Sequence, residues 1–175
     1  MFQRVDEGFF TRDALIVAPD LLGKYLVRRF DDGAMSSFII TEVEVYRGEK
    51  DLGCHASKGK TKRTEIMYAK GGCLYIYLIY GIHWMMNIVT GKVNSPEAVL
   101  HRGVEMFNGP GKLTKGLAID KTFNGEVLSN SQRVWIAPSN NKYKISSGPR
   151  IGIDYAGEYW ANIPWRYWIN LEKKI

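Results

Sequence analysis

The stretch from Phe38 to Tyr46 constrains the fold most, because it has the composition of a β-strand and yet carries two carboxylates. Side chains alternate between the two faces of a strand, so Glu42 and Glu44 share one face with Tyr46. Acidic residues are rarely buried without a partner. This face is therefore expected to meet either water at a sheet edge or a pocket that requires a carboxylate. The alternation predicts one face of Ile39, Thr41, Val43 and Val45 and another of Phe38, Ile40, Glu42, Glu44 and Tyr46.

A basic loop follows this strand. Arg47 and Gly48 end the strand pattern, and the segment His55–Thr64 carries four cations without an acid. Loops at strand ends are common places for functional sites, and clustered like charges create a strong local field. Both phosphate contact and an ordinary solvated surface agree with this pattern. The four cations are Lys58, Lys60, Lys62 and Arg63.

The size and charge of the chain narrow the class of protein. Its 175 residues predict one domain, with residues 1–10 as a tail that is open to disorder. Lysine and arginine outnumber the acids 24 to 18, for a net charge of +6, which favours a polyanionic partner such as nucleic acid or an anionic membrane surface. Cys54 and Cys73 lack the spacing of a zinc site, which indicates a reducing compartment and no structural metal. With no signal-peptide core or bilayer-spanning apolar run in the sequence, we expect a cytoplasmic protein, or a nuclear one if the source is eukaryotic.

Turn residues and periodicity predict a mixed order of helices and strands. Asp31–Gly33 has the composition of a hairpin turn. Tyr80–His83 predicts a second turn, which presents Tyr80 near its tip and on the opposite face from Tyr77. Arg102 lies on the apolar face of a strand, where it needs a carboxylate or phosphate partner. We predict short helices at Ala18–Gly23 and from Asn108 to about Asp120, and strands at Tyr25–Phe30, Phe38–Tyr46, Cys73–Tyr80, Trp84–Thr90, Ala98–Glu105, Arg133–Ile136 and Arg150–Asp154.

Six short blocks carry a family resemblance. They are Leu21–Lys24, Thr41–Tyr46, Leu74–Gly81, Met86–Ile88, Asn108–Leu113 and Arg150–Gly152. A single block of the form Glu-x-Glu-x-Tyr occurs by chance, but six in order are hard to produce accidentally. Together they resemble the alkyladenine (3-methyladenine) DNA glycosylase family of base-excision repair.

The resemblance implies a fold and a reaction. The expected fold is α+β, a single compact domain with a curved antiparallel β-sheet, surrounding short helices and a protruding β-hairpin that enters the DNA minor groove. The expected reaction is monofunctional hydrolysis of an N-glycosidic bond without a metal, another cofactor or a lysine Schiff base. Such an enzyme must extrude the damaged nucleotide from the stack. The implied partner is double-stranded DNA containing damaged purines (3-methyladenine, 7-methylguanine, hypoxanthine or ethenoadenine), bound by a monomer that has no membrane partner.

The resemblance also implies roles for individual residues. Glu44 corresponds to the general base that activates water, and Arg102 to a residue that helps to hold that water. Tyr80 corresponds to the wedge that fills the gap left by the extruded base. Asn87 corresponds to the residue that disfavours the exocyclic amino group of guanine. The implied base pocket is Tyr46, His55, Tyr77 and Asn87, the supporting residues are Glu42, Leu100, Arg150 and Ile151, and the DNA contacts are Lys58, Lys60, Lys62, Arg63 and Lys112.

Two other classes of protein share part of this pattern. A non-catalytic protein that binds damaged or bent DNA would use the same wedge and basic loop, but it would not need Glu44 and Arg102 together. A glycoside hydrolase would use Glu42 and Glu44 as its acid and base, but two neighbours on one strand face cannot flank a sugar from opposite sides.

The chain departs from the family pattern at His83, where an aromatic residue is common, and at His101, where an apolar residue is usual.

Overall fold

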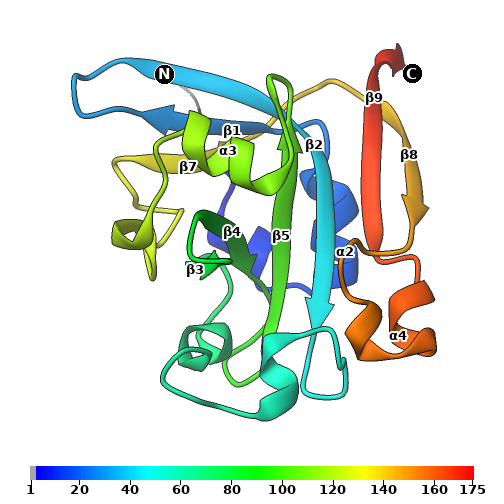
Figure 1. Ribbon diagram of the computed structural model, residues 1–175. Helices are drawn as coiled ribbons and strands as arrows, with labels where there is room; N and C mark the ends of the chain where they lie inside the picture. The colour runs from blue at the N-terminus through cyan, green and yellow to red at the C-terminus, as the bar shows by residue number, and fades with distance from the viewer. Residues whose placement is uncertain (1–2) are drawn as a thin grey trace.

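The computed structural model describes residues 3–175, and within them nine strands form one antiparallel sheet. The strand order is β3-β4-β5-β2-β1-β7, with β9 also beside β2, β8 beside β9 and β6 beside β5. In Figure 1, β2 bends from the β1–β2 hairpin at the top into the centre of the sheet, where it runs beside β5. The predicted α+β class is confirmed. The strands are β1 (Tyr25–Arg29), β2 (Met35–Arg47), β3 (Leu74–Ile79), β4 (His83–Val89), β5 (Glu97–Val104), β6 (Phe107–Asn108), β7 (Val134–Ala137), β8 (Tyr143–Gly148) and β9 (Arg166–Lys174).

A bulge in β2 changes which side chains share a face. The pairing of β2 with β5 shifts register twice between Ile40 and Val43, and such bulges interrupt the alternation of faces. As a result Ile40 and Val43 both pack into the main hydrophobic core, whereas Ile39 packs against Tyr143 and Ile169 of β8 and β9. The prediction that Ile39 shares a face with Val43 is therefore wrong.

Two helices complete the main core. Helix α2 (Ala14–Leu21) begins earlier than predicted, because the carboxylate of Asp13 accepts a hydrogen bond from the backbone N–H of Leu15 at 2.9 Å and caps its first turn. Helix α3 (Pro110–Gly116) ends short of the predicted boundary, because Ala118 takes a φ of +49°, which a helix cannot continue. No helix within residues 3–175 is long and apolar enough to cross a bilayer.

The described part of the N-terminal segment packs onto the domain. Helix α1 (Glu7–Phe10) ends in Phe10, which is buried in the core. The backbone N–H of Val5 donates to the carbonyl of Ile136 on β7 at 2.9 Å. Of the tail that the sequence left open to disorder, the segment from Val5 to Phe10 thus contacts the domain, while residues 1 and 2 lie outside the described chain.

The second hairpin forms as predicted from β3 and β4. Ile79 pairs with His83 across the turn. Helix α3 supports this hairpin, because the hydroxyl of Thr114 donates to the carbonyl of Trp84 on β4 at 2.9 Å. Any displacement of α3 therefore reaches the hairpin directly.

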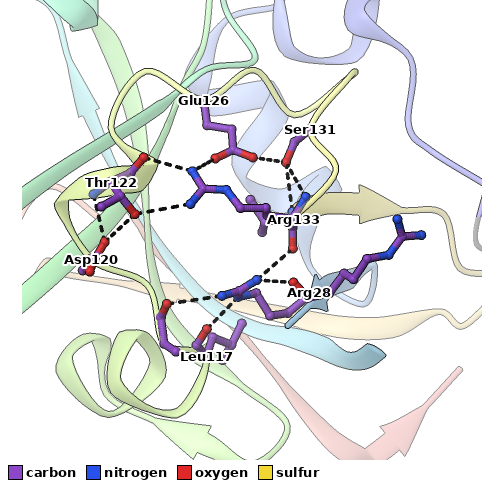
Figure 2. Close-up of polar contacts among 10 residues, drawn as sticks. Arg28, Leu117, Asp120, Thr122, Glu126, Ser131 and Arg133 are labelled. Carbon is purple, nitrogen blue, oxygen red and sulfur yellow. Dashed lines mark hydrogen bonds and ion pairs between the residues drawn. The ribbon is translucent and has the colours of Figure 1, made fainter. Parts of the chain in front are cut away.

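A buried arginine fixes the opposite end of α3. Arg28 on β1 is 3% exposed, and its Nε donates to the carbonyl of Leu117 at 2.8 Å. Its Nη1 donates to the carbonyls of Arg29 and Arg133. Figure 2 shows this guanidinium among backbone oxygens, with Arg133 turned away to contact Glu126. Strand β1, helix α3 and strand β7 are thus joined at one point.

Candidate active site

Glu44 is a fully buried carboxylate on β2. Its Oε1 accepts a hydrogen bond from the backbone N–H of Ile151 at 2.8 Å, and its Oε2 accepts one from the hydroxyl of Tyr46 at 2.9 Å. Arg102 on β5 approaches both carboxylate oxygens at 3.5 Å. The fold therefore brings together four of the residues that the sequence singled out, from three separate stretches of the chain.

Glu42 shares its carboxylate between two arginines. Arg102 Nε lies 3.1 Å from Glu42 Oε1, and Arg166 Nη1 on β9 lies 3.2 Å from the same oxygen. This agrees with the prediction that Arg102 needs a carboxylate partner. Arg166 was not predicted, because nothing in the sequence indicates that β9 pairs with β2.

The surroundings of Glu44 favour its protonated form. Burial raises its pKa, and this effect outweighs the opposing influence of Arg102, the Ile151 N–H and the Tyr46 hydroxyl. Glu42 adds to the rise through like-charge repulsion. Burial also raises the pKa of Tyr46 well above its ordinary value, so that the phenol stays protonated and donates to Glu44. A carboxylate with a raised proton affinity and a fixed orientation is suited to general-base chemistry.

Aromatic side chains surround a hollow of about 210 Å³ next to this carboxylate, which we call the aromatic hollow. The ring centroids of His55 and Tyr77 lie 4.6 Å apart. Asn87 is buried and donates from Nδ2 to the carbonyl of Tyr75 at 3.1 Å. The four predicted base-pocket residues therefore meet around one cavity. Its lining is Tyr46, Gly53, His55, Arg63, Met67, Tyr75, Tyr77, Ile79, Tyr80, Asn87, Ala98, Gly152 and Tyr155.

His55 is held in the wall of this hollow as an uncharged ring. Its Nδ1 lies 2.9 Å from the hydroxyl of Tyr75. Burial, followed by the charges of Arg63 and Lys58, lowers the pKa of His55 to about 4. At neutral pH the ring is therefore neutral. The sequence did not assign a role to Tyr75, although its position two residues before Tyr77 places both on one strand face.

A buried ion pair anchors the chain segment that carries Ile151. Arg150 Nη1 and Nη2 lie 2.6 and 2.8 Å from the two oxygens of Asp51, and both side chains are fully buried. The Arg150 guanidinium also lies 4.9 Å from the ring centroid of Tyr46. Arg150–Asp154 was predicted as a strand, but it forms a bend instead, because Gly152 adopts a φ of +77°. Asp51 was missed, since one acid in a loop gives no sign of a partner about a hundred residues away.

Tyr80 protrudes from the tip of the β3–β4 hairpin and is 86% exposed. Its φ of +54° lies in the left-handed region, which is unfavourable for a bulky residue. Tyr80 and Tyr77 line the same hollow, so the prediction that they point away from each other is wrong. The reason is that β3 ends at Ile79, and strand alternation does not extend into the turn.

A second hollow of about 430 Å³ adjoins the aromatic hollow, and we call it the cationic groove. It shares Tyr77 and Tyr80 with the aromatic hollow and adds Arg102 and Lys112. Leu100, which was assigned a supporting role, also lines it, as does Ile151. Glu44 lines neither hollow, but it contacts Ile151 and Arg102, which line the cationic groove, and Tyr46, which lines the aromatic hollow.

The basic loop is folded by two 3₁₀ turns, η1 (His55–Lys58) and η2 (Glu65–Tyr68), and lies at the lower end of β2 in Figure 1. Its four predicted DNA contacts are exposed, and none of them forms an ion pair with a described acid. Arg63 differs from the other three, because its guanidinium lies 5.4 Å from the ring centroid of Tyr77 and lines the aromatic hollow. Lys112 on α3 is also exposed.

The two departures from the family pattern lie in different surroundings. His83 is exposed on the hairpin, and a Cβ added to Gly111 would approach its Nδ1 to 2.9 Å, so the ring packs closely on the start of α3. His101 is fully buried, and burial lowers its pKa to about 4. It therefore acts as a neutral core residue next to Arg102 in the sequence.

Comparisons with known proteins agree with this architecture. The family model described as methylpurine-DNA glycosylase matches residues 8–107 and 104–173. A relative from Natranaerobius thermophilus is 40% identical, with 95% of each chain covered, and one from Legionella pneumophila (strain Corby) is 42% identical, with 95% of this chain and 94% of its own covered. A relative from Psychrobacter cryohalolentis is 42% identical over 88% of this chain and 86% of its own. All three bear the name "Putative 3-methyladenine DNA glycosylase".

The fold, the site and these matches define a DNA glycosylase, a hydrolase that acts on N-glycosyl bonds in DNA repair. The chain belongs to the methylpurine-DNA glycosylase family. The resemblance inferred from the six sequence blocks is thereby confirmed.

Proposed function

We propose that this enzyme removes alkylated and deaminated purines from duplex DNA by extruding the nucleotide and hydrolysing its N-glycosidic bond with water activated by Glu44. The observation that carries the proposal is that this buried carboxylate contacts residues that line both the aromatic hollow and the cationic groove. The extruded base would occupy the aromatic hollow, and its sugar and phosphates would lie in the cationic groove. The anomeric carbon would then lie where the two adjoin, near Glu44.

The aromatic hollow supplies binding without strict selection of the base. Stacking against aromatic rings is worth about 1–3 kcal/mol per base and tolerates any purine face. Tyr46, His55 and Tyr77 provide the rings, and the neutral state of His55 avoids repulsion of the positive charge on an N-alkylated purine. The buried amide of Asn87 would oppose the exocyclic amino group of guanine. These features support activity on 3-methyladenine, 7-methylguanine, hypoxanthine and ethenoadenine.

The carboxylate environment supports general-base catalysis. A base that takes a proton from water during attack typically contributes about 10²–10⁴ in rate. Glu44 has a raised pKa and two fixed hydrogen bonds, and Arg102 presents a guanidinium on the same side. Arg102 would hold the attacking water, and Glu42 and Arg166 would keep Arg102 in position. A protein that only bound damaged DNA would gain nothing from burying this acid.

The hairpin and the basic loop would hold the DNA open. A tyrosine in an unfavourable backbone conformation at an exposed tip is explained if its ring enters the gap left by the extruded base. Lys58, Lys60 and Lys62 would contact phosphates, in keeping with their exposure. We propose that a single copy of the chain binds the duplex in this way.

One assay tests the proposal. The full-length chain is incubated with duplexes that each carry one damaged purine, and abasic sites are revealed by alkaline cleavage. We expect excision that persists in EDTA and gives no covalent adduct with borohydride, because the proposed mechanism uses neither a metal nor an amine nucleophile. Lesion binding without any abasic product would favour the alternative of a non-catalytic damage-binding protein, and a trapped adduct would contradict the hydrolytic mechanism.

A further inference from the structure

Tyr155 lines the aromatic hollow, and no sequence pattern predicts a role for it. It lies in a 3₁₀ turn, η4 (Asp154–Ala156), and is 72% exposed. It lines both the aromatic hollow and a neighbouring hollow of about 310 Å³ beside the basic loop, which we call the loop hollow. Besides Tyr155, the two hollows share His55 and Arg63. A side chain that lines two adjoining cavities forms part of the wall between them.

The backbone holds Tyr155 firmly in this position. Its turn is flanked by Gly152 and Gly157, with φ values of +77° and +86°, and a Cβ at either glycine would meet no atom within 4 Å. These glycines are therefore required by the backbone conformation and not by packing. Ala156, next to Tyr155, is buried. The turn presents one aromatic ring outward while its neighbours fix the backbone.

The hydroxyl of Tyr155 contacts Gly53, which also lines the aromatic hollow. It lies 3.3 Å from the carbonyl of Gly53, to which it donates a hydrogen bond. Although the residue is largely exposed, burial raises the pKa of its phenol. The ring is thus attached at both ends, by its own backbone and by Gly53.

We propose that Tyr155 is a specificity-determining residue that limits the size of the purine this enzyme accepts, by separating the aromatic hollow from the loop hollow. The inference rests on the proposed function, because it assumes that the extruded base enters the aromatic hollow. At about 210 Å³ that hollow is smaller than the roughly 300–1,000 Å³ of a pocket for a drug-sized ligand. A substituent that outgrows it on the side of Tyr155 would extend into the loop hollow.

The loop hollow has a defined chemistry. Its lining within the described chain includes Lys58 and Arg63 and the hydroxyl residues Ser57, Thr61 and Thr64, and it contains no acid. A polar or electron-rich substituent on the purine would therefore be accepted there once the ring of Tyr155 no longer blocks it. The site thus carries a latent extension for bulky adducts.

The test compares two duplexes that differ only in the lesion. One carries hypoxanthine, and the other carries an adenine with a benzene ring fused to its etheno bridge. Single-turnover excision rates are measured for the wild type, Tyr155→Ala, Tyr155→Phe and Tyr155→Trp. Tyr159→Ala is the matched control, because Tyr159 is 71% exposed on the adjacent helix α4 (Glu158–Asn162) and lines none of the three hollows described above.

We expect Tyr155→Ala to raise the ratio of bulky to hypoxanthine excision by about 10-fold or more, since a difference of one methylene in a tight pocket already changes discrimination by about 10–200-fold. Tyr155→Trp should lower the ratio, and Tyr159→Ala should leave it near the wild-type value. Tyr155→Phe keeps the ring but loses the bond to Gly53, so it should raise the ratio less than Tyr155→Ala does. A general loss of DNA binding cancels in the ratio. An unchanged ratio in Tyr155→Ala overturns the size limit, whereas a wild type that excises hypoxanthine from no duplex at all overturns the proposed function instead.

Discussion

Two arginine side chains in this molecule are largely removed from solvent, and they differ in their hydrogen-bond partners. Arg28 is 3% exposed and donates to backbone carbonyls that join β1, α3 and β7, as Figure 2 shows. Arg102 retains 14% of its side-chain exposure and is paired with Glu42 and Glu44 beside two hollows. The first site satisfies its donors with groups that cannot titrate. The second pairs its cation with carboxylates, and burial raises the pKa of one of them, Glu44, against the opposing effect of Arg102.

The difference separates a structural site from a functional one. Carbonyl partners fix geometry at any pH, so the Arg28 site is suited to holding elements together. At the Arg102 site the burial of Glu44 works against its charge, and such an unfavourable arrangement is typical of residues that serve chemistry. The following predictions test this contrast, from the largest expected effect to the smallest.

The first prediction concerns catalysis at the Arg102 site. Glu44→Gln should reduce single-turnover excision from a hypoxanthine duplex by about 10²–10⁴-fold, because glutamine keeps the shape and loses the base. Band-shift affinity for the same duplex should be similar or tighter, because stacking and extrusion depend on other side chains.

Glu42→Gln is the matched control for this prediction. It removes one carboxylate from the same strand face and contacts the same arginine, yet it should retain measurable turnover because Glu44 keeps its hydrogen bonds to Ile151 and Tyr46. A Glu44→Gln enzyme with a near wild-type rate would falsify the assignment of the base.

The second prediction concerns stability at the Arg28 site. Arg28→Met should lower the free energy of unfolding by about 3 kcal/mol, because the buried carbonyl of Leu117 and the partly buried carbonyls of Arg29 and Arg133 each lose a donor, at about 1–3 kcal/mol per bond. Urea unfolding measures the loss. Arg29→Met is the matched control: Arg29 is partly exposed, and its guanidinium lies 5.7 Å from the ring centroid of Trp135. Equal losses in the two variants would show that the carbonyl cluster does not join the elements.

The third prediction concerns the hairpin tip. Tyr80→Asn should weaken lesion capture by about 10–100-fold, the equivalent of about 1–3 kcal/mol of base stacking. The free energy of unfolding should stay unchanged or rise slightly, because asparagine tolerates a positive φ better than tyrosine does. Band shifts and urea unfolding on one preparation make the comparison. A stability loss of about 3–5 kcal/mol, as for a buried aromatic residue, would mean that Tyr80 is a core side chain.

These three sites differ in how far the sequence could predict them. The face of Glu42 and Glu44 and the hairpin that carries Tyr80 follow from local alternation and turn composition, so they could be predicted. The role of Arg28 could not, because its partners are carbonyls of residues such as Leu117 and Arg133, and carbonyls carry no sequence signal. Asp51 was missed for a related reason, since its partner Arg150 is distant in the chain.

The fold, too, could be predicted only where it depends on local sequence patterns. The order of the first five predicted strands required only local patterns, and the structure contains all of them. The bulge near Ile40 could not be predicted, because it depends on how two strands of unequal length pair. Strand β8 was not predicted either, since its sequence is mostly polar and its partner β9 comes later in the chain. The roles in catalysis came from the family resemblance and not from these patterns.

The fourth prediction concerns the exposed lysines of the basic loop. Unlike Arg28 they do not join elements of the fold, and unlike Arg102 they have no proposed part in catalysis. Replacement of Lys58, Lys60 and Lys62 by glutamine should reduce the slope of log affinity against log salt by about 0.9 for each lost phosphate contact. The measurement is the affinity for an undamaged duplex over a salt series. Lys173→Gln and Lys174→Gln near the C-terminus are the control, because they lower the net charge at positions outside the proposed DNA surface. A slope that stays the same in the loop variant means that this loop is only a solvated surface.

The last prediction is that Glu44 costs the fold stability at neutral pH and that Glu44→Gln recovers it. The pKa of Glu44 is raised in the folded state, so the unfolded chain loses this proton at lower pH than the folded chain does. Stability is therefore lost as the pH rises from the ordinary glutamate pKa through the folded one. The glutamine variant has no proton to lose. Relative to the wild type, its free energy of unfolding should increase between the ordinary and the folded pKa of Glu44 and stay constant at higher pH. The total increase should be smaller than the loss in Arg28→Met. Urea unfolding of both proteins from acidic to neutral pH measures this difference in the free energy of unfolding. If the difference is constant with pH, or changes in the opposite direction, burial does not disfavour the charge of Glu44. The Arg102 site would then be a structural site like that of Arg28.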